Sequence, residues 1–475
     1  MRVRGRLPGD ERLRLERVKP EQIQVTAPRR RRPPPPAPLV LIYGFLAMIV
    51  VGTIILVLPV SSAGGQWTPV LDALFTATSA VCVTGLVVVD TGTYWSGFGQ
   101  VVIMLLIQAG GFGFMTSSTL LLLLVVRRRT RLRDRVLVQQ TMGAGQLGDV
   151  TDLVKRVAIF TLLAEGFGAL VLAASFIGNG QAPGTALWFG AFHSISGFNN
   201  SGFDLMGSVG QSSLRGLQTD YVVLGTLGLL ITLGGLGYAI VEDVARARRW
   251  RRFALETKVV VLTSIALVAV GAATIGILEW DNPATLGPLS ADQRIVNAIF
   301  ESVTLRTAGF SALDTGALLE PTIFVVIALM FIGGASGSTA GGIKVNTFSL
   351  LLIAIVSTAR GLPSAEAFGR RIQHEVVYRA LAVALLSIAF LFLISLLLEV
   401  ISQEAFVDVL FEAVSGLGTV GASRGITPGL SDPAHIVLII AMFAGRLGPL
   451  TLVLALTARR HAVAYRHAVE SIRIG

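Results

Sequence analysis

Four glycines at regular spacing are the positions where this sequence could coordinate a cation. Gly85, Gly202, Gly309 and Gly421 are separated by 117, 107 and 112 residues. Glycine has no Cβ, so it adopts conformations that are closed to other residues and lets the backbone approach a ligand closely. Turns that point backbone carbonyls inward can replace the hydration shell of an ion. Four such turns around one axis would therefore form an ion-selectivity filter.

Each glycine follows a short, partly apolar segment that is too brief to cross a bilayer. These segments are Val70–Val81, Thr185–Ser196, Ile295–Thr304 and Phe406–Gly416. A short helix whose C-terminal end points at the centre adds partial negative charge there, which favours a cation. In three of the repeats an aromatic residue lies ten positions before the glycine, but Phe300 lies only nine before Gly309. We therefore expect the fourfold symmetry to be approximate.

The composition is that of a polytopic membrane protein. Of 475 residues, 53% are hydrophobic and 14% charged, and the mean hydropathy is +0.71, which is outside the range of soluble globular chains. Eight apolar runs are long enough to cross a bilayer, one of them broken. They are Leu39–Val60, Gln100–Val126, Leu153–Ile177, Tyr221–Val241, Lys258–Leu278, Thr322–Ser357, Val376–Ile401 and Ala434–Thr457.

The positive charge is local and indicates membrane topology rather than nucleic-acid binding. Residues 1–32 hold eleven Lys/Arg against four Asp/Glu. Further basic clusters at Arg127–Arg135, Arg246–Lys258 and Arg360–Arg379 alternate with separators that contain at most two Lys or Arg. By the positive-inside rule these clusters, and both termini, are expected in the cytoplasm.

The fold class expected is therefore all-α: four tandem units of helix, pore helix, loop and helix, in pseudo-fourfold arrangement around one central pore. The expected domains are a disordered basic N-terminus at 1–38, repeats at 39–126, 127–246, 247–359 and 360–458, and a basic tail at 459–475.

The third repeat contains the segment Phe331–Lys344, which carries five glycines in fourteen residues and cannot continue a membrane helix. Non-helical backbone at membrane depth is tolerated only where protein covers it or where it lines a water-filled path. The segment is therefore expected to be a mobile gate below the Gly309 loop, with a static kink as the alternative. Candidate gate residues are Gly333, Gly334, Ala335, Ser336, Gly337, Ser338, Thr339, Ala340, Gly341, Gly342 and Lys344.

Arg446 is a cation near the middle of the last apolar run, where it should face the bundle interior or water. Two interpretations are open: a structural pair with an acid or with helix-end carbonyls, or a place in the conduction path just inside the filter. For Lys344, snorkelling or anchoring is an equal alternative to gating. His193 and Glu301 are expected to be hydrogen-bonded, with concentration of cations near the outer mouth as the alternative for the acid. Glu165 is expected to pair within the bundle, with a proton relay as the alternative, and Cys82 to be a core residue.

The glycine turns, the sequence GGASGSTAGGIK (Gly333–Lys344) and the sequence GRLGPLTL (Gly445–Leu452) resemble the Trk/Ktr/HKT superfamily of potassium transporters, most closely the KtrB and TrkH membrane subunits. The polar lead-in favours the KtrB type. The resemblance implies that carbonyls of the two residues before each glycine coordinate K⁺: Val83 and Thr84, Asn200 and Ser201, Thr307 and Ala308, Thr419 and Val420.

The resemblance also implies potassium uptake across the plasma membrane by a homodimer docked on a cytosolic, nucleotide-binding regulatory ring. No cofactor is expected on this chain, and Na⁺ is a candidate activating ion. The sequence holds no P-loop, dinucleotide fingerprint or hydrolase constellation, so we expect no enzyme activity. The alternatives are a H⁺- or Na⁺-coupled symporter of the TrkH type and a carrier with inverted repeats; four repeats in one orientation argue against the carrier.

Overall fold

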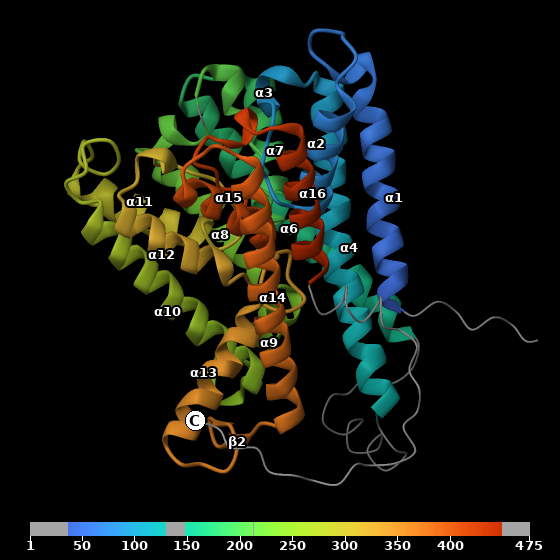
Figure 1. Cartoon of the computed structure of the whole chain (residues 1–475), viewed down its shortest axis with the longest axis vertical. Helices are drawn as coiled ribbons and strands as arrows, with labels where there is room; N and C mark the ends of the chain where they lie inside the picture. Colours follow the sequence, from blue (N-terminus) through green and yellow to red (C-terminus); the bar gives the residue numbers. More distant parts are fainter. Residues whose placement is uncertain (1–36, 130–147, 212, 449–475) are drawn as a thin grey trace, which may run out of the picture. The chain divides into compact units, whose positions relative to one another are not determined.

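In the computed structural model each repeat begins with a long helix, followed by a short helix that ends at the predicted glycine turn (Figure 1). The structure describes residues 37–129, 148–211 and 213–448, which lie within one compact unit. The long first helices are α1 (Ala37–Val57), α6 (Gly148–Gly178), α10 (Leu255–Leu278) and α14 (His374–Ile401). The short pore helices are α2 (Val70–Cys82), α7 (Pro183–Phe198), α11 (Ala291–Thr304) and α15 (Phe406–Gly418), as the sequence predicted.

A further helix completes each repeat after the turn. In the first repeat it is the long helix α4 (Gly97–Arg129), and in the fourth the structure describes α16 (Asp432–Leu447), which ends one residue before the described part stops. In the second it is divided into α8 (Tyr221–Leu236) and α9 (Tyr238–Ala247), and in the third into α12 (Glu320–Phe331) and α13 (Val345–Ala359). The small elements include α3 (Thr91–Tyr94) and a hairpin of β1 (Glu366–Ala367) and β2 (Arg370–Arg371).

Helix packing arranges the four repeats in a closed ring. Each pore helix packs against the first helix of its own repeat, in the pairs α1 with α2, α6 with α7, α10 with α11 and α14 with α15. The last helix of each repeat packs against the pore helix of the next repeat, in the pairs α4 with α7, α8 with α11, α12 with α15 and α16 with α2. Because α16 returns to α2, the order closes, which is the pseudo-fourfold arrangement expected from the sequence.

Buried apolar side chains fill the boundaries between repeats. Phe192 of the second repeat lies in one core cluster with Phe310 of the third, and Phe75 of the first lies in another with Leu438 of the fourth. A third cluster joins Met330 and Phe411. Within a bilayer such contacts stabilise the bundle by close packing rather than by removal of water.

Glycines let the last helix of a repeat approach its own pore helix. A Cβ added to Gly110 would lie 2.0 Å from the carbonyl oxygen of Val81, and one added to Gly445 would lie 1.9 Å from that of Leu417. At Gly234 the corresponding distance to the carbonyl oxygen of Phe198 is 1.8 Å. A side chain at any of the three positions would therefore force the last helix and its pore helix apart.

Among the described residues, four straight helical segments are long and apolar enough to cross a membrane: Gly97–Met115, Asp152–Gly178, Leu255–Leu278 and His374–Ile401. They agree with four predicted spans. For the first and last predicted spans the structure describes α1 and α16, but residues beyond 448 lie outside the described part. The total of eight crossings therefore stays a prediction.

The span predicted over Tyr221–Val241 is present as a bent pair of helices, and this bend was not predicted. The chain bends by 96° between α8 and α9. Gly237 at the bend has φ +75°, and a Cβ there would lie 3.0 Å from the carbonyl oxygen of Gly337. Three glycines within Gly234–Gly237 weaken the helix locally, but the bend itself depends on contact with another repeat.

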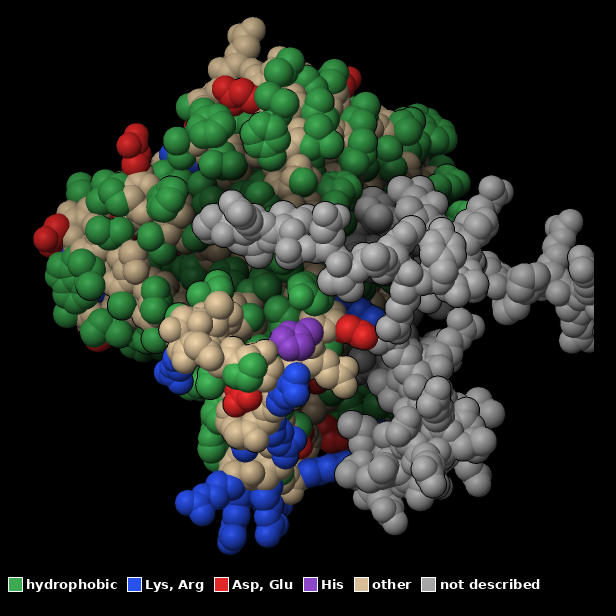
Figure 2. All heavy atoms as spheres, turned by 60° about the horizontal axis from the view of Figure 1, so that its bottom comes forward, with side chains coloured by type: hydrophobic (Ala, Val, Ile, Leu, Met, Phe, Trp, Pro, Cys, Tyr) green, Lys and Arg blue, Asp and Glu red, His purple; other side chains and the backbone are tan. Residues whose placement is uncertain are grey.

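Two of the basic clusters lie together at one end of the unit, where Figure 2 shows Lys and Arg side chains gathered. The ring of Trp250, in the turn before α10, lies 6.3 Å from that of Phe368 in the β hairpin. Arg251, Arg252, Arg370 and Arg371 are exposed here. The N-terminal segment up to residue 36, most of the Arg127–Arg135 cluster and the C-terminal tail lie outside the described residues.

Candidate functional site

The four predicted glycines form a closed ring in which each fits against the next loop. A Cβ on Gly85 would lie 2.2 Å from the carbonyl oxygen of Ser201, and one on Gly202 would lie 2.4 Å from that of Ala308. A Cβ on Gly309 would lie 2.2 Å from the oxygen of Val420, and one on Gly421 would lie 2.0 Å from that of Thr84. The structure thus brings together all four loops around one axis, with no room for a side chain at any of the glycines.

The residue two positions before each glycine has a left-handed backbone. The φ angles are +56° at Val83, +57° at Asn200, +107° at Thr307 and +48° at Thr419. Positive φ is a genuine outlier for β-branched residues such as valine and threonine, and each such residue stores on the order of 1–3 kcal/mol of strain. The positive φ therefore recurs at one position in all four loops, with strain at the three β-branched residues, and it sets the direction of the carbonyls there.

Hydrogen bonds at the ends of the pore helices hold this conformation. In the first loop Val83 N donates to Ala80 O at 3.1 Å and Thr84 N donates to Ser79 O at 2.8 Å, the pattern of a Schellman motif. The second and fourth loops repeat it, with Ser201 N donating to Ser196 O at 2.8 Å and Val420 N to Ser415 O at 2.9 Å.

The third loop follows a different pattern, which agrees with the approximate symmetry predicted from Phe300. There Ala308 N and Gly309 N both donate to Thr304 O, at 2.8 and 3.2 Å. The third repeat has one residue fewer between the aromatic and the glycine, and the difference lies before the left-handed Thr307. Gly309 therefore still occupies its place in the ring.

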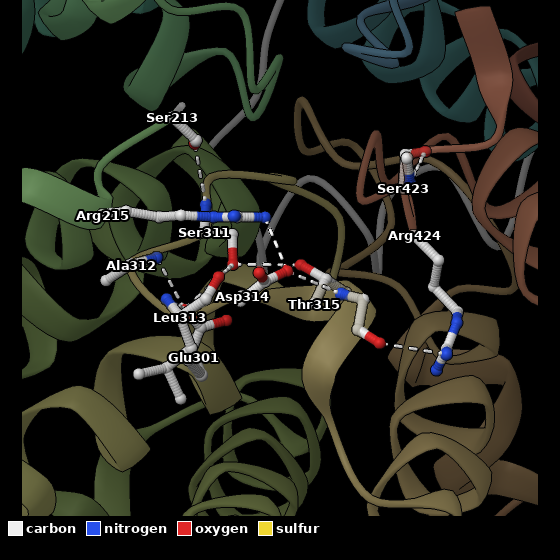
Figure 3. A network of polar contacts seen from close by, with 12 residues as sticks. Ser213, Arg215, Glu301, Ser311, Ala312, Leu313, Asp314, Thr315, Ser423 and Arg424 are labelled. Carbon is white, nitrogen blue, oxygen red and sulfur yellow. Dashed lines mark hydrogen bonds and ion pairs between the residues drawn. The ribbon is translucent and has the colours of Figure 1, made fainter. Parts of the chain in front are cut away.

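In the second, third and fourth repeats, the buried polar residue after the aromatic of the pore helix fastens the chain beyond the glycine. Glu301 accepts hydrogen bonds from the backbone N–H groups of Ala312 and Leu313 at 2.7 and 2.9 Å (Figure 3). In the second repeat His193 Nε2 accepts from Leu205 N at 3.4 Å. These bonds confirm the expected hydrogen-bonding role of both residues.

Side chains also tie the loops beyond the filter to one another. Arg215 of the second repeat forms an ion pair with Asp314 of the third at 2.7 Å, and Arg424 of the fourth donates to the carbonyl of Gly316 at 3.2 Å (Figure 3). Arg424 also pairs with Asp408 at 2.5 Å. The loops of three repeats are therefore joined across one face of the filter.

The segment between α12 and α13 is a compact, buried loop. Gly333 N donates to Ile343 O at 2.8 Å and Val345 N to Gly334 O at 3.0 Å, which closes the loop at its base. Ala335 N donates to Gly235 O at 2.8 Å. The bend after α8 leaves that carbonyl without a helical partner, so the loop completes the end of the divided helix.

This loop lies directly against the glycine-turn loops. The side chain of Asn200 contacts Thr339 Oγ1 at 3.0 Å. A Cβ on Gly341 would lie 1.8 Å from Thr419 Oγ1, and one on Gly333 would lie 3.2 Å from Thr307 Cγ2. The side chains at three of the four left-handed positions thus face the loop.

Arg446 of the fourth repeat, Phe114 of the first repeat and the loop's own Lys344 hold the loop in place. Arg446 is 1% exposed; it donates to the carbonyl of Thr339 and, at 3.0 Å, to that of Gly110. The ammonium of Lys344 donates to the carbonyl of Ala340. Phe114 of α4 lies 4.9 Å from Lys344 Nζ and 4.6 Å from Arg446 Cζ.

These contacts show the bonding partners of both cations, while their roles in the gate stay predictions. Arg446 bonds backbone carbonyls rather than an acid, and Lys344 turns back onto the loop instead of extending toward a membrane surface. Cys82 is fully buried, as expected.

Arg306, Phe114 and Gly237 were missed by the sequence analysis. Arg306 follows the third pore helix, and its Nη2 donates to the carbonyl of Gly333 at 3.2 Å. An arginine three residues before a filter glycine, at membrane depth, was a signal that could have been used. For Gly237 the signal was the cluster of Gly234, Gly235 and Gly237 within an apolar run, whereas Phe114 carried none because its role depends on distant partners.

Comparisons with known proteins agree with this geometry. The family model of the TrkH cation transport proteins matches residues 39–461. The chain is 40% identical to Ktr system potassium uptake protein B of Bacillus subtilis over 88% of this chain and 92% of that protein. It is 35% identical to potassium/sodium uptake protein NtpJ of Enterococcus hirae, with 91% and 96% covered.

The fold resembles the crystal structure of the potassium transporter TrkH from Vibrio parahaemolyticus, with a TM-score of 0.70 over 91% of this chain and 88% of that chain at 17% identity. The long apolar helices of this chain and its match to the TrkH family model make it a multi-pass membrane protein. With a family model that matches nearly the whole chain, the protein belongs to the TrkH family of cation transport proteins.

Proposed function

We propose that this chain takes up potassium across the cell membrane, as the ion-translocating subunit of a Ktr-type system. The observation that carries the proposal is the closed ring of Gly85, Gly202, Gly309 and Gly421, each fitted against a carbonyl of the next loop. The relatives named for potassium uptake, and for potassium/sodium uptake, support the same ion class.

Backbone carbonyls of the ring select the ion. The oxygens of Val83 and Thr84 and of their counterparts in the other three loops replace the hydration shell of K⁺. The four pore helices end next to the ring, and their C-terminal partial charges favour a cation there. Left-handed residues fixed by helix-end hydrogen bonds give the oxygens set positions, which supports selection by coordination geometry.

The segment Gly333–Gly342, with Lys344 and Arg446, forms the gate. The loop lies against side chains of three filter loops. Arg446 adds a positive charge beside it, and a cation in the path opposes cation flow. Opening requires the loop to leave these contacts, and its glycines supply the conformational freedom for that movement.

A cytosolic partner controls the gate. The relative named as a component of the Ktr system supports a second subunit, which we infer to be a nucleotide-binding ring, with two copies of this chain docked on it in the plasma membrane. The basic end formed by the α9–α10 turn and the β hairpin supports a cytoplasmic location for that face. Both termini lie on the same side, and Na⁺ is the candidate activating ion.

Uptake of ⁸⁶Rb⁺ by cells that lack their own potassium uptake tests the proposal. The chain, supplied with a regulatory partner, should restore uptake, and K⁺ should compete better than Na⁺. A chain that reaches the membrane but restores no uptake would exclude this function.

A further inference from the structure

A buried carboxylate behind the second filter loop has no part in the mechanism described so far. Glu165 lies in the middle of α6 and is 5% exposed. None of the ion pairs found among the described residues involves it. A carboxylate in the interior of a membrane protein is costly and marks a functional site unless it is merely paired.

Two side-chain amides hold this carboxylate. Gln108 of α4 donates from Nε2 to Glu165 Oε2 at 3.1 Å. Asn199 donates from Nδ2 to Glu165 Oε1 at 3.0 Å and to Gln108 Oε1 at 2.9 Å. The three side chains form a closed triangle that joins the first repeat, the second repeat and the end of a pore helix.

The triangle acts on the filter through Asn199. Asn199 is the C-cap of α7 and immediately precedes Asn200, which has φ +57°. On the opposite side, a Cβ on Gly111 would lie 1.9 Å from Asn199 Oδ1, so the amide is also confined sterically. The corresponding residues of the other loops, Cys82, Arg306 and Gly418, carry no carboxamide. Only the second loop is fixed in this way.

We propose that Glu165, acting through Gln108 and Asn199, is a positioning residue that sets the K⁺ selectivity of the second filter loop. The inference rests on the proposed function, since it concerns how the filter selects. When the triangle is intact, Asn199 cannot turn, and the left-handed residue beside it keeps its carbonyl directed at the ion. When the triangle is broken, the loop relaxes and the spacing of the coordinating oxygens is no longer fixed.

The donor and acceptor pattern makes a specific test available. Glu165 accepts at both oxygens, whereas a carboxamide has one acceptor and two donors. In Glu165→Gln the new amide NH₂ group must therefore face the NH₂ group of Gln108 or of Asn199, so one hydrogen bond is lost. Gln108→Glu alone sets two carboxylates against each other. Together the two substitutions exchange acid and amide, and every bond of the triangle can form again with Asn199 unchanged.

The experiment measures reversal potentials in K⁺ and Na⁺ gradients across membranes that contain the full chain and its regulatory partner. Each single substitution should lower the permeability ratio of K⁺ to Na⁺ about fivefold, as expected for the loss of one buried hydrogen bond. The double variant should return to the wild-type ratio. Thr161→Val is the matched control: Thr161 lies one turn earlier on α6, is 2% exposed and has an unpartnered hydroxyl, so its removal should leave the ratio unchanged.

The inference would be overturned by single variants at normal membrane level with wild-type selectivity. A double variant no more selective than the single variants would also overturn it. If neither single variant nor the double variant reached the membrane, the triangle would have only a role in folding, and the inference would again be overturned. Failure of the proposed function looks different, because the wild-type chain itself would then show no K⁺ selectivity; the inference would fall with it.

Discussion

Arg446 donates a hydrogen bond to the backbone carbonyl of Thr339, near the middle of the loop that joins α12 to α13. The same guanidinium reaches Gly110 of α4, so one side chain from the fourth repeat fastens a loop of the third to a helix of the first. The side chain is 1% exposed. This contact combines the two interpretations of Arg446, since the residue bonds carbonyls and also lies beside the proposed path.

Replacement of Arg446 should open the gate. Arg446→Gln removes the charge and at least one of two charge-assisted bonds, each worth about 1.5–3 kcal/mol, and we expect ⁸⁶Rb⁺ flux to rise about tenfold. Arg446→Lys retains the charge but not the forked geometry, so its flux should be intermediate. Unchanged flux in both variants at normal membrane level would indicate a purely structural residue.

Gly341→Ala should have a similar effect by steric means. Its Cβ would lie 1.8 Å from Thr419 Oγ1, so the loop must move away from the filter. Flux should increase while K⁺ remains preferred. Gly225→Ala, in α8 with nothing within 4 Å of the added Cβ, is the control. Equal flux in the two variants, or deletion of several loop residues without effect, would favour a static kink.

Gly85→Ser should weaken selection between K⁺ and Na⁺. The added side chain meets the carbonyl of Ser201, and the residue must keep φ +94°. We expect the permeability ratio from reversal potentials to fall about tenfold, a difference of about 1.4 kcal/mol in relative stabilisation of the two ions. A serine at Gly166, which has open space, should not change the ratio.

Arg306→Gln tests whether the loop has a second attachment. Arg306 bonds Gly333, at the opposite end of the loop from Lys344. Since Arg306 and Arg446 hold the same loop, their effects on flux should not be additive. The fold-increase in flux of the double variant should therefore be smaller than the product of the fold-increases of the two single variants. Full multiplicative behaviour in ⁸⁶Rb⁺ uptake would indicate independent roles.

Glu301→Ala should destabilise the protein more than loss of the nearby surface pair. It leaves the buried N–H groups of Ala312 and Leu313 unsatisfied, at about 1–3 kcal/mol each. Asp314→Asn removes a half-exposed ion pair worth about 0–1 kcal/mol. Thermal unfolding in detergent should show a clearly lower midpoint for Glu301→Ala only; equal midpoints would contradict the buried-network account.

Much of the architecture could be predicted because it depends on local sequence patterns, namely the length of apolar runs and the positions of glycines. The pore helices end within a few residues of the predicted positions, and the break after Phe331 separates two helices as expected. The bend at Gly237 was not predicted, although Gly234, Gly235 and Gly237 lie within four residues, because the bend depends on a tertiary contact. A glycine inside an apolar run is compatible with a straight helix, and here the bend accompanies contact with Gly337, one hundred residues further along the chain.

By itself, the sequence determined the four repeats, the four filter glycines, the broken helix and the family, because apolar length, helix-ending residues and glycine spacing are properties of short stretches of chain. Only the tertiary structure decided that each glycine faces a carbonyl of the next loop, that Arg446 bonds Thr339, and that Glu165 holds Asn199. The physical reason is that these contacts join different helices, and in apolar helices of similar composition no local pattern specifies which buried polar group meets which.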